Sequence, residues 1–581
     1  MSTLFADARW RDQNVSLLQN LSKPSAVLET SIRANSLPPP EEAHLLQYLE
    51  HSLNGSHVQN PFLLRRDVQQ LYHSVFSSAH GAASRPHLPL HLQRQTDFRV
   101  FMILAIGAVP LYRSGRHPSH PYGYFLAAMN YMDSNLLSRG LDSIQDLLLV
   151  VRFGIYHHIG RTSIWGLTTL CMRMCIEQNL HKPPRSKPAS RRSLLHQQMQ
   201  RRVFWECYMI DRYSSITLDR PFAIADKDIQ VGLPADASDE EIDAAEASGS
   251  FPDLDSFCRA IACRSPGTTT ELSVFFLCVR LRKITSKIHA RFRHQEAPVS
   301  PVHPTTMQDI TASGRIYGDL EELLQELQEW RLSAPVFPAP QSLYQMQAWY
   351  DLLLMRERLL LVRKAIDLVP KPGNTPPEDL LSLCLEYAIA TIQTFCPLFD
   401  ANTITYTRSY FQMLFTAGLS VMFCLSSLAA PTSAVRGQAV EAVEQSERAL
   451  KRMGKELPDA VHYIAVYEAL RSHVIGKMRM APRLAAEWDE ACRHERATAQ
   501  EELLVQDDAN HYPANSPGLN HRPPSSNNNN PPLENDPQLD PSLFSLDIFG
   551  DSTFWNMEYG LGEYAYGDPL LYSSLLHDES L

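Results

Sequence analysis

The sequence predicts an all-α fold. Between about residues 61 and 500, apolar residues recur at helical spacing, and no sustained alternation of apolar and polar residues marks a strand. The chain has 40 prolines and 24 glycines, which is typical of many interrupted helices with some disordered segments. We therefore expect an all-helical body over 61–500, preceded by a partly disordered linker over 1–60.

Two neighbouring segments illustrate the helical pattern. The first, DSIQDLLLVVRFGIYHH, is predicted to start with a capping box made by Asp142 and Gln145 and to end at Gly160. The second is apolar on most of its circumference, which predicts burial on several sides, and Thr162 or Ser163 is expected to cap it. The short connection predicts that the two helices are antiparallel neighbours.

Later segments continue this pattern. Helices are expected at about 199–218, 270–293, 315–331, 342–367, 378–396, 407–428 and 436–454. The segment 236–255 carries eight acidic residues and no basic one, so we expect a solvated, mobile loop there.

The C-terminal part differs in charge and composition. The net charge of the chain is −11, and the stretch from Pro523 to Leu581 holds ten acidic residues and no basic one. The rest is close to neutral, which gives no global electrostatic case for nucleic-acid binding. Residues 501–535 form a low-complexity linker, and 536–581 interleave acidic residues with aromatic ones. This alternation favours an activation segment over an inert soluble tail.

The aromatic residues of that segment are the expected docking groups. They are Phe544, Phe549, Phe554, Trp555, Tyr559, Tyr564, Tyr566 and Tyr572. Negative charge is expected to keep such side chains solvated and available to dock as a short helix into an apolar groove of a partner. The first five are the candidate activation residues.

Motifs for catalysis, metal binding and membrane insertion are missing from the sequence. There is no HExxH helix, phosphate loop or GxSxG elbow, so we expect no enzyme and no cofactor. The ten cysteines form no CxxC pair, and Cys171 with Cys175 would need two more ligands to hold a metal. His157 and His158 are expected on different sides of their helix, at the surface and rim. With no signal core and no apolar run of spanning length, a soluble intracellular protein without membrane contact is expected.

A basic stretch separates two of the predicted helices. It contains Lys182, Arg185, Lys187, Arg191 and Arg192, followed by Arg201 and Arg202. It fits an import signal or a phosphate-contacting patch, but a solvated loop between buried helices is the favoured interpretation.

Three separated blocks resemble the fungal-specific transcription factor domain, the middle homology region of zinc-cluster regulators. RRVFWECYMIDRYSSITLDRPFAIADKDIQVGLP, Arg201 to Pro234, resembles its hallmark. The preceding helical pair resembles the family's pair that closes with Leu-Gly-Leu-His, although Asn179 stands here in place of Gly. Asp97 to Val109 resembles its first core helix, and Leu323, Leu327 and Trp330 fit a later LxxLxxW-type helix. The resemblance covers about 60–430.

The hallmark residues are interpreted as structural. They are Arg202, Trp205, Asp211, Arg212, Arg220 and Pro221. Charges beside a segment as apolar as VFWECYMI need partners, so Asp211 is predicted to pair with Arg212 or Arg220 and to fix the turn at Pro221.

The resemblance also implies a function. It indicates a nuclear RNA polymerase II transcription regulator, most simply an activator of a metabolic or secondary-metabolite gene set, with transcription machinery or a coactivator as partner. Family members usually begin with a six-cysteine zinc cluster, whereas the first cysteine here is Cys171. Direct DNA binding is therefore expected only if a preceding segment or a partner supplies that cluster.

Two alternatives stay open. One is a co-regulator or repressor without its own DNA-binding domain, which acts by heterodimerising with a DNA-binding relative; homodimers are also considered. The other is a metabolite-binding protein or enzyme that shares the fold, which predicts a polar cavity with convergent titratable groups.

Overall fold

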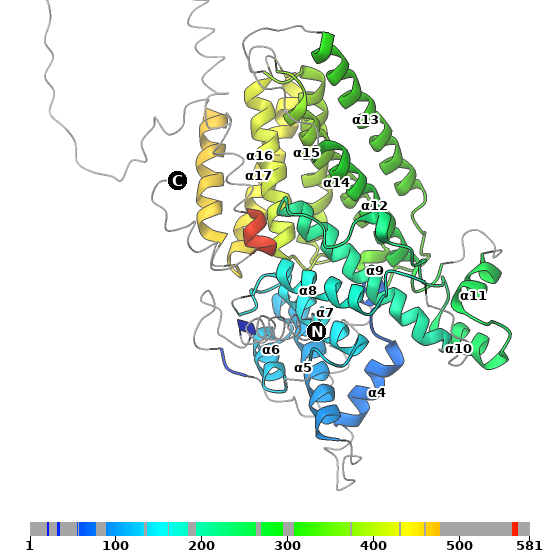
Figure 1. The fold of residues 1–581 in the computed structure, drawn as a ribbon. Coiled ribbons are helices and arrows are strands. Elements are labelled where there is room, and N and C mark those ends of the chain that lie inside the picture. The colour runs from blue at the N-terminus through cyan, green and yellow to red at the C-terminus, as the bar shows by residue number, and fades with distance from the viewer. Residues whose placement is uncertain are drawn as a thin grey trace, which may run out of the picture. The chain divides into compact units, whose positions relative to one another are not determined.

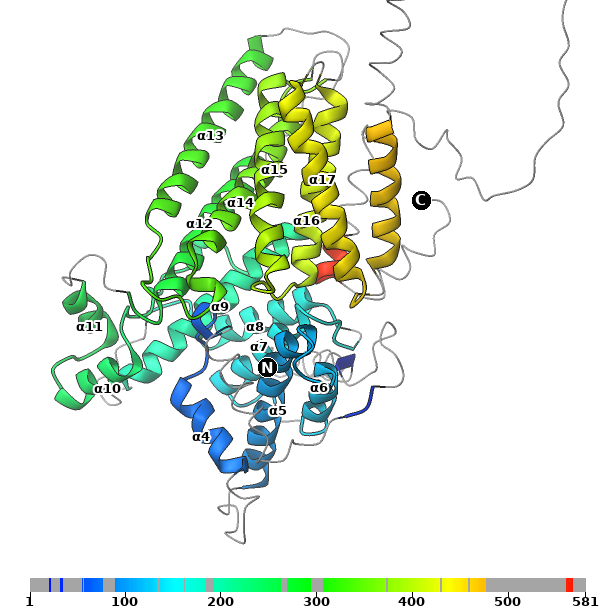
Figure 2. The ribbon, with the colours of Figure 1, turned by 180° about the vertical axis from the view of Figure 1, so that it is seen from behind.

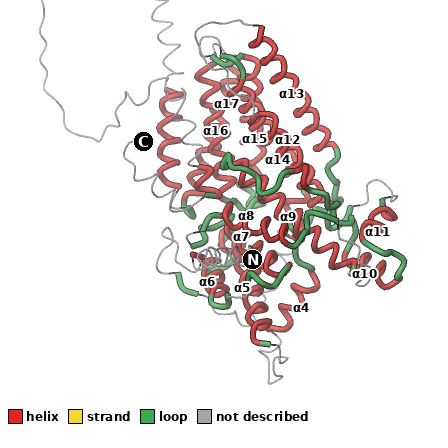
Figure 3. The backbone as a smooth tube through the Cα atoms, viewed as in Figure 1, coloured by secondary structure: helices red, strands yellow, loops and turns green. Residues whose placement is uncertain are grey.

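The helical architecture is seen in a computed structural model (Figures 1 and 3). It describes residues 20–21, 32–34, 55, 57–76, 89–132, 136–160, 162–183, 193–262, 269–293, 307–371, 375–428, 431–457, 460–476 and 561–567. Within these ranges there is no strand, and the only bridge joins Ile159 and Thr162. The predicted all-α fold is confirmed.

The chain divides into two compact units. The first comprises 1–464 with 556–581, and the second comprises 465–555. Of the second unit, the structure describes 465–476, which are helical. The following description concerns the first unit.

The helices of the first unit have the following bounds in chain order. They are α3 (His57–Gln59), α4 (Arg65–Phe76), α5 (Leu90–Arg113), α6 (Pro121–Met129), α7 (Leu141–Gly154), α8 (Ile164–Glu177), α9 (Leu194–Thr217), η3 (Asp226–Asp228), α10 (Asp239–Ser248), α11 (Leu254–Ile261), α12 (Ser273–Arg293), α13 (Met307–Leu332), η4 (Leu343–Gln345), α14 (Gln347–Leu368), α15 (Glu378–Asp400), α16 (Arg408–Ser427) and α17 (Ser433–Gly454). Residues 561–566 add a short C-terminal helix. Figures 1 and 2 show α13 to α17 running side by side.

The loop predicted over 236–255 is wrong, because half of it is α10 and its last two residues begin α11. The Ser238 side chain accepts a hydrogen bond from the backbone N–H of Glu241, and the Glu241 carboxylate accepts one from the N–H of Ser238. This capping box satisfies two donors that the helix start would otherwise leave open. At the other end Gly249 adopts a left-handed φ of 65°, which terminates the helix. The negative charges thus occupy a helix with defined ends.

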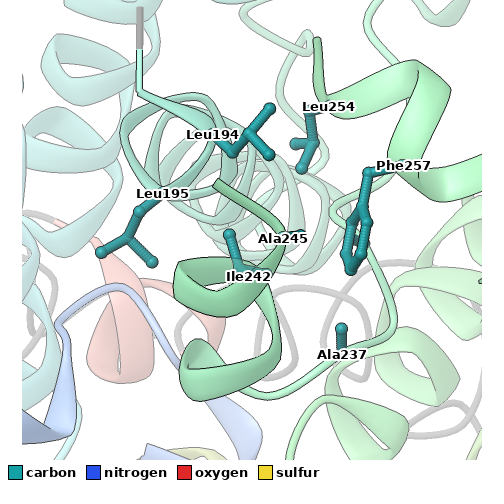
Figure 4. Packing of buried hydrophobic residues seen from close by; sticks show 8 residues of the cluster. Leu194, Leu195, Ala237, Ile242, Ala245, Leu254 and Phe257 are labelled. Carbon is teal, nitrogen blue, oxygen red and sulfur yellow. The ribbon is translucent and has the colours of Figure 1, made fainter. Parts of the chain in front are cut away.

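The acidic helix is also anchored by apolar contacts. Its buried side chains join the start of α9 and α11 in one cluster, shown in Figure 4, which contains Leu194, Leu195, Ala235, Ala237, Ile242, Ala245, Leu254 and Phe257. Burying such a cluster stabilises the arrangement by the hydrophobic effect and excludes a freely solvated loop.

The boundaries of α7 differ from those predicted, whereas one of the two caps predicted for α8 is observed. Helix α7 begins at Leu141 after Gly140, whose φ is 67°, so Asp142 lies in the first turn and caps nothing. The helix ends at Gly154 and not at Gly160. Ser163 does cap α8, because its hydroxyl accepts a hydrogen bond from Gly166 N.

Asn179 occupies a left-handed position just after α8, with φ 59°. The N–H of Leu180 donates to the Cys175 carbonyl at 2.9 Å, and the N–H of Asn179 donates to that of Ile176 at 3.0 Å. These two bonds form a Schellman helix end, which favours Gly or, next best, Asn at the left-handed residue. The position where the related sequences usually have Gly therefore keeps its geometry with Asn.

Two helices, α15 and α16, are long and apolar enough to cross a membrane by length and composition, which the sequence reading did not anticipate. In the structure 61% and 72% of their apolar windows are buried among neighbouring helices. That degree of burial is typical of core helices.

Candidate functional site

The hallmark segment closes around Arg212, near the end of α9. This guanidinium is fully buried and donates to Asp211 Oδ2 at 2.6 Å, to the Ile224 carbonyl at 2.8 Å and to Asp226 Oδ1 at 3.0 Å. The rings of Tyr208 and Phe222 cover it, each 4.2 Å from the guanidinium carbon. Hydrogen bonds and aromatic faces thus compensate the loss of water around the charge.

The carboxylate partners of Arg212 shape the turn that follows α9. Asp211 accepts a hydrogen bond from the Ala223 N–H at 3.2 Å, so it holds both the helix end and the returning chain. Burial alone would raise the pKa of Asp226, but hydrogen bonding from Ser286 and the charge of Arg212 lower it overall. Of the two arginines considered for Asp211, Arg212 is the partner.

Other hallmark residues tie α9 to its neighbours. Arg202 is fully buried, with Nη2 2.7 Å from Asp239 Oδ1 at the start of α10. The Trp205 indole N–H donates to the Gly232 carbonyl at 3.0 Å. These contacts fit a structural role and bring no reacting groups together.

Glu206, the next residue of α9, is a buried carboxyl without such support. Neither of its oxygens has a hydrogen-bond partner among the described residues. Burial raises its pKa to about 8, while the charge of Arg152 acts in the opposite direction. Glu206 is therefore largely protonated at neutral pH.

Arg220 leaves the turn in another direction and contacts the C-terminal segment. Asp219, with φ 47°, ends α9, and the N–H of Arg220 donates to the Ser215 carbonyl at 2.8 Å. The Arg220 guanidinium lies 4.6 Å from the Trp165 ring and forms an ion pair with Glu563. The Glu563 side chain is 0% exposed and that of Arg220 24%, so the tail residue is the more deeply inserted partner.

The segment 561–567 packs against body residues beside the start of α16 (red helix, Figure 1). We call the body residues around it the tail groove: Gly154, His158, Trp165, Tyr213, Thr217, Leu218, Arg220, Arg408, Ser409, Phe411 and Tyr463. Within the segment, Leu561, Glu563, Tyr564 and Ala565 are at most 1% exposed.

Arg408 organises one side of the tail groove. Its guanidinium donates to the Tyr564 carbonyl at 2.7 Å and to the Gly154 carbonyl at 2.5 Å, and contacts His158 Nδ1 at 2.7 Å. A buried cation that binds a carbonyl near the end of a short helix satisfies an acceptor that the helix itself leaves open. Arg408 thus connects the tail to the loop after α7.

Aromatic contacts complete this side. The Tyr564 ring lies 5.8 Å from the His158 ring, 5.9 Å from Phe411 and 6.0 Å from Tyr463. Edge-to-face pairs at such distances add to the stabilisation from burial. The groove therefore accommodates one aromatic ring deeply.

The second aromatic residue of the segment rests on a polar network. The Tyr566 ring lies 5.3 Å from Tyr213, whose hydroxyl is 2.6 Å from Ser409 Oγ and accepts a hydrogen bond from Arg356 at 3.2 Å. Arg356 in turn pairs with Glu357 at 2.5 Å. Burial raises the pKa of Tyr566 well above its usual value, so the tyrosine stays neutral.

Gly562 lies against the end of α9. A Cβ at this position would be 2.8 Å from the Thr217 carbonyl oxygen. Backbone cannot yield as a flexible side chain does, so this contact requires glycine if the segment is to stay in place.

Comparison with known proteins identifies most of this body. Residues 45–332 match the fungal specific transcription factor domain, a span that includes the hallmark, the Schellman end and α13. This part of the chain therefore carries the domain of that family. Helices α14 to α17 and the tail segment lie beyond the span that matches the domain.

Relatives among curated proteins carry regulatory names. The chain is 30% identical over 165 residues to "Negative regulator of pleiotropic drug resistance STB5" of Candida glabrata, which covers 28% of this chain and 16% of that protein. It is 30% identical over 141 residues to "Protein STB5" of Saccharomyces cerevisiae (24% and 19%). It is 25% identical over 226 residues to "Putative transcriptional regulatory protein YJL206C" of the same yeast (37% and 28%). The chain thus spans less than a third of each relative, and no solved structure matches it.

The structure corrects two expectations about the burial of side chains. Both His157 and His158 are buried and not at the surface, and burial holds the pKa of His157 well below its usual value. Tyr564 and Tyr566, expected to be solvated, are buried in the tail groove. Phe544, Phe549, Phe554, Trp555 and Tyr559 lie outside the described residues. So do Arg185, Lys187, Arg191 and Arg192 of the basic stretch.

The cysteines of α8 lie near a third on α9. Burial, together with the neighbouring thiols of Cys171 and Cys175, raises the pKa of Cys207 well above its usual value. A thiol kept protonated is a poor metal ligand. Across the part of the chain that the structure describes, no group of three or more His, Cys, Asp or Glu is arranged to hold a metal ion.

One cavity of about 990 Å³ lies between α5, η4 and the ends of α15 and α17. Two of its basic residues are already engaged: Arg113 donates to the carbonyls of Tyr156 and Tyr406, and Arg452 binds Asp400 and Asn402. Cations are favourable at helix C-termini in any case. These contacts account for the charges of Arg113 and Arg452 without a ligand.

Proposed function

We propose that this chain is a nuclear RNA polymerase II transcription regulator, whose helical body controls an activating C-terminal segment. The family match and the regulatory names of the relatives support regulation of transcription. The activating role is supported by the alternation of acidic and aromatic residues over 536–581. This composition is the observation that carries the proposal.

DNA contact is assigned to a zinc cluster outside the described body. The relatives from Fusarium oxysporum are named as Zn(2)-C6 fungal-type factors. In this sequence the first cysteine is Cys171, and it lies in the core of the body. A cluster supplied by a preceding segment or by a heterodimer partner would place the chain on DNA, while the body and tail set the output.

A reporter assay tests the activating role. Residues 500–581 are fused to an unrelated DNA-binding domain, and the matched control replaces Phe549, Phe554 and Trp555 by Ala. Strong activation that the triple variant loses supports an activating tail that works through aromatic docking. A silent wild-type fusion would contradict it.

A second candidate is a co-regulator that restrains a DNA-binding relative. The burial of the tail segment in the body supports this co-regulator function, because a buried segment is not available to bind coactivators. The same assay separates the two functions, since a co-regulator predicts silence from the tethered tail and reduced activity when the full chain is co-expressed with its relative.

A further inference from the structure

We propose that the tail groove is a peptide-binding site whose ligand is the chain's own Leu561–Gly567, and that reversible docking of this segment withholds the activation region. The regulatory consequence rests on the function proposed above. The docking itself does not, and it can be measured separately.

The groove selects a definite kind of peptide. Arg220 binds a carboxylate, the pocket of His158 and Phe411 takes an aromatic ring, and Arg408 binds the carbonyl of that aromatic residue. A close backbone approach at Thr217 demands glycine. The matching ligand is a short helical peptide with Gly, an acidic residue and an aromatic residue in succession, as in Gly562, Glu563 and Tyr564.

Several features favour a releasable contact over a fixed part of the core. A helical segment this short does not form stably by itself, so its order depends on the groove. The contacts that hold it are a few buried side chains, one ion pair and the hydrogen bond from Arg408, set against the conformational entropy lost when seven residues become ordered. Competing partners can displace a docked state of this kind.

Docking removes two aromatic residues of the tail from solvent, Tyr564 and Tyr566. A coactivator groove that binds these tyrosines would therefore have to compete with the body for them.

Gly562→Ala in the full chain is the sharpest test. The added methyl group meets the Thr217 carbonyl and blocks docking, yet it leaves every acidic and aromatic residue unchanged. Alanine also favours helix formation more than glycine, so lost docking cannot come from a poorer helix. Gly437→Ala on α17 is the matched control, because a Cβ there has nothing within 4 Å.

Two readouts are taken on each full-chain protein. Amide hydrogen exchange of 561–567 measures docking, and a reporter driven by the full chain fused to an unrelated DNA-binding domain measures output. For Gly562→Ala we expect at least tenfold faster exchange in the segment and a several-fold higher reporter signal. For Gly437→Ala we expect neither change.

A charge exchange provides an independent check. Arg220→Glu should release the segment, and combination with Glu563→Arg should restore slow exchange and low output. Unchanged exchange in Gly562→Ala would overturn the docking. Faster exchange with unchanged output, while the isolated tail activates, would overturn the regulatory role. If the isolated tail is silent, the proposed activation fails, although the exchange result still stands.

Discussion

Two arginines at the end of α9 have opposite kinds of partner. Arg212 forms ion pairs with carboxylates no more than 14 residues away in the chain, whereas Arg220 forms one with Glu563, 343 residues away. A local partner is present as soon as the turn folds. A distant partner arrives only when the tail docks. We therefore expect Arg212 to stabilise the fold of the body, and Arg220 to stabilise the docked state of the tail.

A large effect is expected at the local pair. Asp211→Ala leaves Arg212 with one carboxylate fewer and frees the Ala223 N–H, so the free energy of unfolding should fall by about 3 kcal/mol. Chemical denaturation checks this value. Asp228→Ala, an exposed acid in the same turn, should stay within about 0.5 kcal/mol of the parent. An unchanged midpoint for Asp211→Ala would remove the structural interpretation of Arg212.

A pH series tests Glu206, a buried carboxyl of α9 that lacks a hydrogen-bonded partner among the described residues. Its pKa rises from 4.5 to about 8 on folding, so folding takes up a proton between these values. Stability from this group is therefore present below pH 4.5, falls as pH rises, and levels off above about 8. Glu206→Gln should flatten this slope and stabilise the protein at pH 8 by about 1–3 kcal/mol. Melting curves of the parent and the variant at pH 5 and pH 8 test this prediction. An equal loss of stability at both pH values would contradict it.

Two buried tyrosines give a direct contrast between the sites. Tyr208→Ala, beside Arg212, should cost about 3–5 kcal/mol, as for other buried aromatic residues. Tyr564→Ala should cost no more than about 1 kcal/mol, because the body stays folded after the segment is released. Denaturation of both full-chain variants gives the comparison. Equal costs would make Leu561–Gly567 a fixed part of the core.

A small effect is expected at the cap of α10, the helix that carries Asp239, the partner of Arg202. Ser238→Ala removes the capping box and should lower stability by about 1 kcal/mol, with faster amide exchange confined to α10. Ser250→Ala, exposed beyond the helix end, serves as its control. Exchange that rises throughout α9 as well would show that the Arg202 contact depends on the cap.

Local patterns carried most of the fold. Apolar periodicity located α9 and α12 to α17, and the need of a buried charge for a partner pointed to Asp211 and its neighbours. The capping box Ser238–Glu241 is also present as a sequence motif, but the acidic composition of the segment led to the prediction of a loop. The burial of His158 and the pairing of Arg220 with Glu563 could not be predicted, because both depend on segments hundreds of residues apart that no spacing rule connects.

The close approach of Gly562 to α9 has a consequence for substitutions in the tail. A Cβ at this position would lie 2.8 Å from the Thr217 carbonyl oxygen, so the position is sensitive to the shape of the residue alone. A single added methyl group would therefore abolish docking, although it changes neither the charge of the tail nor its aromatic content.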